Sequence, residues 1–185
     1  PESMLLLNSD TLIAADSSRD LLLQLDLQTK QAKVLLGGSG GGDRTGQLYK
    51  ARIDDPGRLV AASQTLLYLL DRKNRKIKRI DLKKSTISTI AGDGGAHQDG
   101  IAKNAGFTYP RGMAFDGKHT LYISDAGSHT IRTIDLSNPD RTVTTIAGTP
   151  NQSGDLDGAA LSAKLNRPDG LVFDGANNRL IIADV

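Results

Sequence analysis

Short apolar-rich runs, separated by polar turn-forming residues, follow one another along this chain. In the region 112–147, runs at 112–116, 121–125, 130–135 and 142–147 are separated by Gly, Asn, Asp and Pro. Apolar and β-branched runs with such breaks are typical of short strands joined by tight turns. No long segment places apolar residues at the 3.6-residue period of a helix. The pattern therefore predicts an all-β fold.

The same pattern recurs about every 55 residues, which indicates internal repeats. One predicted strand in each copy ends in an aspartate: Asp16, Asp71, Asp125 and Asp184. A proline precedes each of these aspartates at a nearly constant spacing: Pro1, Pro56, Pro110 and Pro168. Each complete copy contains four predicted strands, and tandem four-stranded antiparallel units are the signature of a β-propeller. We predict one partial propeller domain over 1–185, with blades at 1–50, 51–104, 105–162 and 163–185.

These boundaries give an incomplete propeller of about three and a half blades, whereas a closed propeller has roughly four to eight. An incomplete ring leaves apolar blade faces and a strand edge uncovered. We therefore expect the remaining blades to come from a longer parent chain, with a second copy of this chain as the alternative. The first residue is Pro1, without an initiator Met or a signal-like segment, and this agrees with a piece of a longer protein.

Composition narrows the possible chemistry. The 23 Lys and Arg against 21 Asp and Glu give a formal charge of +2, which argues against a bulk polyanion binder. The absence of cysteine excludes a disulfide scaffold, a thiolate zinc site and a cysteine nucleophile. Three histidines argue against a His-rich metal site. No run approaches the roughly 18 apolar residues of a membrane helix, and nothing assigns a compartment.

The repeated residues resemble the NHL repeat. The third copy has Ile-Ala-Gly at 90–92, Asp-Gly at 99–100, Leu-Tyr-Ile-Ser-Asp at 121–125 and Ser-His-Thr-Ile-Arg at 128–132. The fourth has Ile-Ala-Gly at 146–148, Asp-Gly at 157–158 and a Pro-Asp-Gly at 168–170. The first copy departs from the pattern, with Glu2 and Ser3 in place of the glycine-bearing pair and Arg44 and Thr45 where Asp-Gly would begin. The resemblance implies an NHL-type propeller and leaves the function open, because propellers host many functions.

The four repeated aspartates, Asp16, Asp71, Asp125 and Asp184, invite two interpretations. As structural residues, their carboxylates accept backbone N–H bonds and fix a hairpin. As functional residues, they form a ring of metal ligands. We favour the structural interpretation, because a residue present in every blade belongs to the blade.

The glycine-rich segments 37–42 and 92–95 lack the helix and the Lys that a phosphate loop requires, so we interpret them as connections between blades. In propellers of this kind such connections share one face with the turns after the repeated aspartates, and that face is the predicted binding face. Candidate binding residues there are Arg72, Lys73, Arg75, Lys76, Asp93, His97, Asp99 and Arg111.

The segment 72–79 holds six basic residues in eight. Some NHL domains bind RNA through a basic face, and such a patch would contact phosphates. The alternative is a solvated hairpin, and we favour it because one blade does not make a groove and aromatic residues are only 4% of the chain.

Some NHL-like propellers are metal-dependent lyases or lactonase-like hydrolases with ligands near the central channel. Residues that could line such a channel here are Arg111, Asp116, Asp169 and Asp174. Asp-Gly at 116–117 and 174–175 is also an ordinary hairpin turn, which we favour. His97, His119 and His129 occupy non-equivalent positions in their blades, which argues against a common ligand set.

The sequence therefore favours a non-catalytic scaffold that binds a protein or another ligand through its loop-rich face. A metal-assisted lyase or lactonase, with a divalent ion held only in the complete propeller, and RNA binding remain the alternatives. No cofactor or metal ligand set is evident, and a protein is the expected partner.

Overall fold

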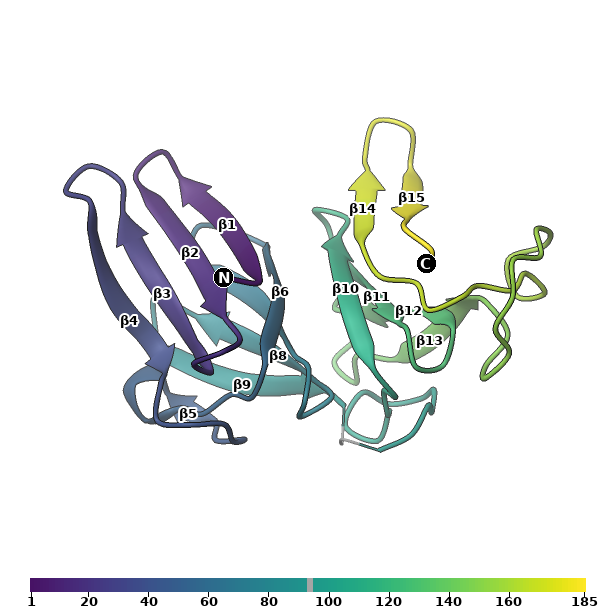
Figure 1. The fold of residues 1–185 in the computed structure, drawn as a ribbon, viewed down its shortest axis with the longest axis horizontal. Helices are drawn as coiled ribbons and strands as arrows, with labels where there is room; N and C mark the ends of the chain where they lie inside the picture. The colour runs from purple at the N-terminus through teal and green to yellow at the C-terminus, as the bar shows by residue number, and fades with distance from the viewer. Residues whose placement is uncertain (93–94) are drawn as a thin grey trace. The chain divides into compact units, whose positions relative to one another are not determined.

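The structure is a computed structural model that describes residues 1–92 and 95–185, and nearly all of its regular structure is antiparallel strand (Figure 1). The chain forms two compact units, residues 1–89 and 90–185. The first unit contains two complete blade sheets, and the second contains one complete blade sheet and a two-stranded sheet. The predicted all-β class and the four-stranded repeat are confirmed.

The first unit contains two sheets. The first has the order β1-β2-β3-β4, with strands Ser3–Asn8, Thr11–Asp16, Leu21–Asp26 and Gln31–Gly37. The second has the order β5-β9-β8-β7-β6, with strands Gly46–Gln47, Thr86–Ala91, Lys76–Asp81, Leu66–Asp71 and Pro56–Ala61. The 3-10 helix η1, Leu48–Lys50, follows β5. The short strand β5 lies in the connection between the two blades and extends the second sheet at its β9 edge.

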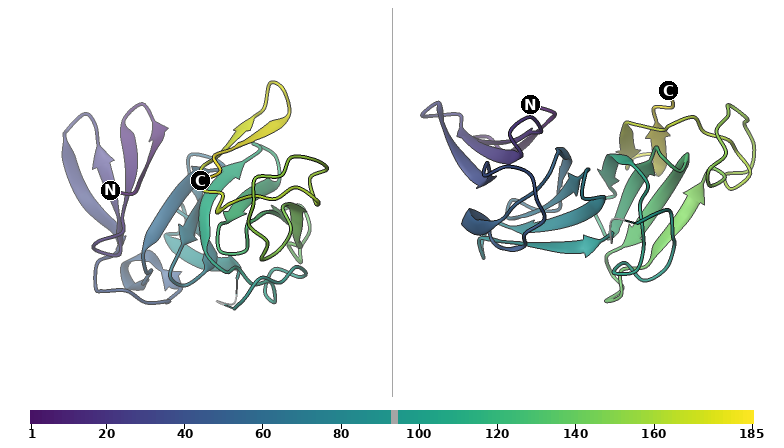
Figure 2. Two further views of the ribbon diagram at one scale, coloured as in Figure 1. Left: turned by 45° about the vertical axis from the view of Figure 1, so that its right-hand side comes forward. Right: turned by 60° about the horizontal axis from the view of Figure 1, so that its bottom comes forward.

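The second unit also contains two sheets. One sheet has the order β10-β11-β12-β13, with strands Pro110–Phe115, Thr120–Asp125, Thr130–Asp135 and Val143–Ala147. The last sheet pairs β14 and β15, Leu171–Asp174 and Arg179–Ile182. Figure 2 shows the strands of each sheet side by side from two further directions.

Two of the connections between blades pair through a glycine with the last strand of the blade that follows. Gly46 pairs with Ile87 of β9, and Gly100 pairs with Val143 of β13. Each connection therefore covers the outer edge of the sheet that follows it in the chain, and this protects an edge strand that would otherwise stay open. We call the connections 38–55, 95–109 and 148–167 the linkers.

Strand alternation builds the core of the first unit. Ile13, Ala15 and Leu22 of the first sheet pack with Leu67 and Leu69 of the second, and all five are fully buried. Successive residues of a strand point to opposite faces of its sheet. The residues between them therefore form the other face of each sheet.

That other face of the first sheet is apolar and partly exposed. Cross-strand pairing aligns one row of apolar residues across it: Met4, Ala14, Leu23 and Val34. The neighbouring row is also apolar: Leu6, Leu12, Leu25 and Ala32. Met4 and Leu6 are 64% and 60% exposed. We call these two rows the apolar face of the first sheet.

A close backbone approach joins the two sheets of the second unit. A Cβ added to Gly112 of β10 would lie 1.9 Å from the backbone oxygen of Asp169. Ser124 bridges the same contact, because its hydroxyl accepts from the Gly112 N–H and donates to the Asp169 oxygen, both at 2.6 Å. Only glycine fits this position without moving one blade from the other.

Candidate functional site

The repeated aspartates bond to the linkers. Asp71, Asp125 and Asp184 each accept backbone N–H groups from the linker that precedes the first strand of their own blade. The donors within 2.9 Å are Asp54, Tyr109 and Asn166, respectively. The carboxylates thereby tie the start of each blade to the end of its second strand.

Asp16 has different partners. It accepts from the hydroxyl of Ser18 at 2.7 Å and from the Arg19 guanidinium at 2.8 Å. These two side-chain bonds lower the pKa of Asp16 to about 2. In the first blade the aspartate therefore stabilises the β2–β3 turn itself.

Burial has the opposite effect on Asp71, whose side chain is completely covered. Desolvation raises the pKa of Asp71 to about 6, although the Asp54 N–H, the Asn74 amide and the Lys78 ammonium all favour its ionised form. The Asn74 amide donates to Asp71 at 2.9 Å and also to the Gly42 oxygen at 2.8 Å. Asn74 thus connects the β7–β8 turn to the first linker.

A fully buried cation faces the repeated aspartate in the third blade. The guanidinium of Arg132 donates to Asp99 at 2.6 and 3.0 Å and lies 3.6 Å from the Asp125 carboxylate. It also donates to the backbone oxygens of Gln98 and Gly106, at 2.8 and 2.9 Å. These bonds use Asp99, a predicted binding residue, to hold the second linker against the blade.

The second blade has the same arrangement with a lysine. Lys78 is fully buried, lies 3.7 Å from Asp71 and forms a close ion pair with Asp43 of the first linker. Lys78 and Arg132 occupy equivalent repeat positions. Their pairing with a linker carboxylate is a structural element of the fold that the sequence did not reveal. The available signal was a basic residue recurring in one strand together with an acidic residue in the preceding linker.

The basic hairpin is largely paired within the first unit. Arg72 is 8% exposed and contacts Glu2 and Asp55, at 2.6 and 2.7 Å. Lys73 pairs with Asp54 at 3.2 Å, and Lys76 pairs with Asp43 at 2.5 Å. Arg75 adopts a left-handed backbone, with φ of 54°, in the turn between the strands. This segment is therefore not the fully solvated hairpin that the sequence suggested, and internal carboxylates neutralise much of its charge.

The histidines occupy separate environments. His97 lies near the repeated aspartate of its blade, with Nδ1 3.9 Å from Asp125 and Nε2 3.4 Å from the Thr145 hydroxyl. Burial, together with the positive Arg132, lowers the pKa of His97. His129 instead accepts the Arg167 N–H through Nδ1 at 3.1 Å. The structure brings His97 together with Asp99 but does not bring the histidines together as a ligand set.

The four residues considered for a channel form one pair and two turns. Arg111 lies 3.3 Å from Asp169 and 5.6 Å from the centre of the Tyr109 ring. Asp116 accepts the backbone N–H groups of residues 118–120 in the β10–β11 turn. Asp174 accepts from Asn177 and Arg179 in the β14–β15 turn, and these bonds lower its pKa.

Within residues 1–92 and 95–185, no three His, Asp or Glu side chains come together in a way that could hold a metal ion. Asp93, another predicted binding residue, lies outside the described residues. No helix in the described part of the chain is long and apolar enough to cross a membrane.

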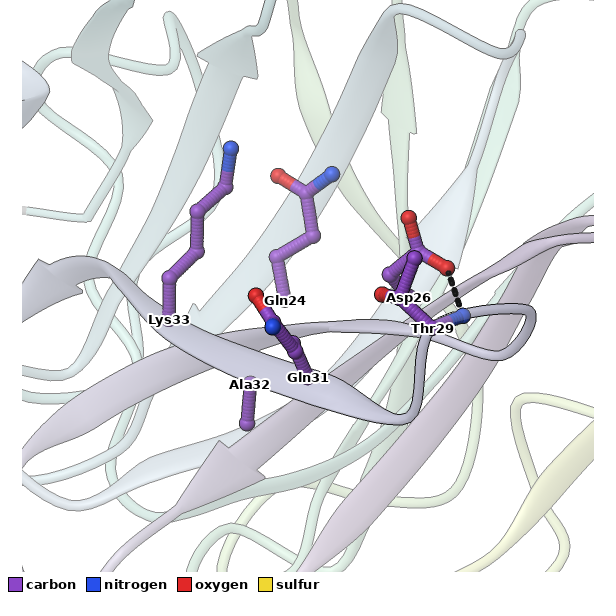
Figure 3. Close-up of a pocket in the computed structure, with 6 residues that line it drawn as sticks. All are labelled: Gln24, Asp26, Thr29, Gln31, Ala32 and Lys33. Carbon is purple, nitrogen blue, oxygen red and sulfur yellow. Dashed lines mark hydrogen bonds between the residues drawn. The ribbon is translucent and has the colours of Figure 1, made fainter.

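A pocket of ≈210 Å³ lies at the β3–β4 hairpin. Figure 3 shows the residues that line it: Gln24, Asp26, Thr29, Gln31, Ala32 and Lys33. Asp26 accepts the Thr29 N–H at 2.8 Å and the Gln28 N–H at 2.9 Å. The acid of this pocket therefore stabilises the turn, and the pocket lies at the end of the sheet opposite the linkers.

Comparison with known proteins gives relatives in plants and animals. The chain is 33% identical over 132 residues to SUPPRESSOR OF QUENCHING 1, chloroplastic, of Arabidopsis thaliana, covering 66% of this chain and 12% of that protein. It is 26% identical over 216 residues to NHL repeat-containing protein 2 of Homo sapiens, covering 100% of this chain and 29% of that protein. No protein-family model matches the chain.

A solved structure has a similar fold. An auxiliary nutrient binding protein from Bacteroides thetaiotaomicron superimposes with a TM-score of 0.78 at 21% identity, over 98% of this chain and 44% of that one. The chain therefore spans less than half the length of each of these proteins.

Tandem antiparallel four-stranded sheets joined by linkers, two of which extend a sheet edge, define a β-propeller, here an incomplete one. The repeat motifs and the relatives together identify the family. It belongs to the NHL-repeat β-propeller family.

Proposed function

We propose that this propeller segment is a binding scaffold whose linkers contact a protein partner. The observation that carries the proposal is the exposure of large apolar side chains in the linkers. In the third linker, Leu156 and Leu161 are 57% and 62% exposed. Exposed leucines of this kind are common contact residues of protein interfaces, where burial of apolar area contributes to affinity.

The backbone of the third linker is well fixed, although it contains no strand. The backbone N–H of Gly148 donates to the Ala160 oxygen at 2.9 Å, and the backbone N–H of Lys164 donates to the Leu156 oxygen at 2.9 Å. The Thr149 hydroxyl donates to the Leu161 oxygen at 3.3 Å. A fixed loop loses little conformational entropy on binding, which favours its use as a contact surface. That the fold serves an auxiliary nutrient binding protein is consistent with a binding role.

The test is a double substitution, Leu156→Asp with Leu161→Asp, in the natural full-length protein. We expect partners that are recovered with the wild type after cross-linking to be lost from this variant, while its far-ultraviolet circular dichroism spectrum stays unchanged. Lys118→Asp, at an exposed turn of the same unit, is the control and should keep them. Recovery of the same partners at the same yield from the double variant would contradict the proposal.

We also propose that another propeller blade covers the apolar face of the first sheet. The repeat places Met4, Leu6 and Leu12 at the positions of Leu59, Ala61 and Leu67 in the second blade. In the second blade this face packs against the preceding sheet. The equivalent face of the first sheet therefore has the composition and geometry to receive a further blade, from a longer chain or from a second copy.

A further inference from the structure

Two arginines face each other in the first linker. The N–H of Arg44 donates to the Arg52 oxygen and the N–H of Arg52 donates to the Arg44 oxygen, both at 3.1 Å. Residues that exchange both backbone bonds in an antiparallel bridge project their side chains to the same side. Like charges placed directly opposite one another repel. The backbone therefore holds two guanidinium groups on one side of the linker at an electrostatic cost.

The two arginines line a cleft of ≈330 Å³ together with Ser39, Tyr49, Lys50 and Ala51. Among the described residues, no carboxylate forms an ion pair with Arg44, Lys50 or Arg52. The cations of the neighbouring hairpin, by contrast, are paired with acids. The cleft thus gathers three positive charges that form no ion pair with a described carboxylate.

Arg52 is also held in place. One of its terminal nitrogens donates to the Ser39 oxygen, and its Nε is buried without a hydrogen-bond partner. A Cβ on Gly42 would lie 3.3 Å from the Arg52 Cβ and 3.4 Å from its Nε, so the glycine leaves room for this side chain. A guanidinium that is already positioned loses little further entropy when it binds a ligand.

The propeller does not require these arginines. The same backbone bridge recurs in the second linker, between Gln98 and Gly106, with bonds of 3.1 and 3.2 Å. Both residues there are neutral. The fold therefore needs the bridge and not its charge, and the opposed arginines are a specific feature of the first linker.

We propose that this cleft binds a phosphate group carried by a planar ring, as in an aromatic phosphate monoester. The phosphate oxygens accept from Arg44 and Arg52, whose guanidinium groups suit tetrahedral oxyanions, and the ammonium of Lys50 adds a third charge. The Tyr49 ring, 77% exposed and 5.3 Å from the Lys50 ammonium, receives the planar part. This inference is independent of the partner contact proposed for the third linker.

Titration followed by nuclear magnetic resonance tests the site, with the Nε–H signals of the arginines as the readout. The probes are phenyl phosphate, inorganic phosphate and benzoate, in about 0.15 M salt, where exposed charges are screened beyond roughly 8 Å. We expect saturable shifts of the Arg44 and Arg52 signals, with phenyl phosphate binding more tightly than inorganic phosphate. Benzoate carries one negative charge and should bind more weakly than phenyl phosphate.

Variants locate the binding. Because Arg44 is exposed, Arg44→Gln should leave the fold intact. The affinity for phenyl phosphate should fall at least about tenfold, through the loss of a charge-assisted hydrogen bond. Tyr49→Ala should remove the preference for phenyl phosphate over inorganic phosphate. Arg58→Gln, an exposed arginine of β6, is the matched control and should change neither affinity. Unchanged affinity in Arg44→Gln, or shifts spread equally over all exposed arginines, would overturn the proposal, as would tighter binding of benzoate.

Discussion

Replacing the buried Arg132 with Met tests the idea that internal ion pairs fix the linkers. The guanidinium bonds to Asp99, Gln98 and Gly106, lies beside Asp125 and stacks 5.0 Å from the centre of the Phe107 ring. Methionine keeps a similar length and apolar packing but removes every one of these polar contacts. The substitution therefore isolates the charge and its bonds.

The structure sets the size of the effect. Removal of the guanidinium leaves the fully buried Asp125 carboxylate without its nearby cation, and breaking a buried pair in this way costs about 3–5 kcal/mol. The backbone oxygens of Gln98 and Gly106 each lose a donor, at about 1–3 kcal/mol for a buried group. Asp99 is 40% exposed and regains water, which limits its share. These contributions belong to one network and do not add simply, so we expect a loss of at least about 3 kcal/mol in the free energy of unfolding.

Urea denaturation followed by circular dichroism measures this loss, and hydrogen exchange locates it. Peptides from 95–109 should exchange faster in Arg132→Met, because the linker loses its bonds to β12. Arg58→Met, at an exposed position, should change stability by less than about 0.5 kcal/mol. In the Arg132→Met background, Asp125→Asn should cost less than in the wild type, with a coupling of at least about 1 kcal/mol. A loss below about 1 kcal/mol, with additive effects of the two substitutions, would refute the account.

Three further substitutions test other parts of the structure. Because the pKa of Asp71 is higher in the folded state, its contribution to stability falls as the pH rises from about 4 to 6. Between pH 4 and 7, the free energy of unfolding of Asp71→Asn should therefore rise by up to roughly 3 kcal/mol relative to that of the wild type, as measured by urea titrations at each pH. Parallel pH profiles of the two proteins would contradict this. Gly112→Ala should destabilise the second unit by about 2 kcal/mol or more in thermal unfolding. Gly170→Ala should not, because a Cβ there would lie 3.7 Å from its nearest neighbour, the Ala183 Cβ. Equal effects of the two substitutions would refute the close contact at Gly112. Met4→Ser with Leu6→Ser should lower the association of the isolated chain in sedimentation experiments, and unchanged association would show that another surface is responsible.

The strands and their repeat were predictable because local signals agree. Turn residues bound each strand, and the repeated proline and aspartate set the period, so the predicted run 130–135 coincides with β12 (Thr130–Asp135). The propeller architecture followed from four strands in each repeat. These features depend on short-range patterns that recur in one chain.

The buried cations were not predictable by the same reasoning. A basic residue that directly follows an isoleucine in a strand is ordinarily expected to face solvent, since Lys and Arg are rarely buried without a partner. Lys78 and Arg132 are nevertheless buried, and their partners come from linkers distant in the sequence. Asp43 lies two residues before Thr45, the position that matches Asp99, so repeat alignment alone does not reveal it.

The opposed arginines of the first linker were also beyond sequence reasoning. Arg44 appeared there only as a departure from the Asp-Gly pattern. Its position facing Arg52 depends on a two-residue bridge inside an irregular linker, which no periodicity signals.

The central claim is that the linkers, and not the opposite ends of the sheets, contact the partner. Site-specific photo-cross-linking in the natural full-length protein tests it most directly, with the photoreactive residue at Leu161 or, separately, at Lys118 in the β10–β11 turn. The account predicts a discrete cross-linked partner from position 161 and none from position 118. A partner captured from position 118, with none from position 161, would contradict it.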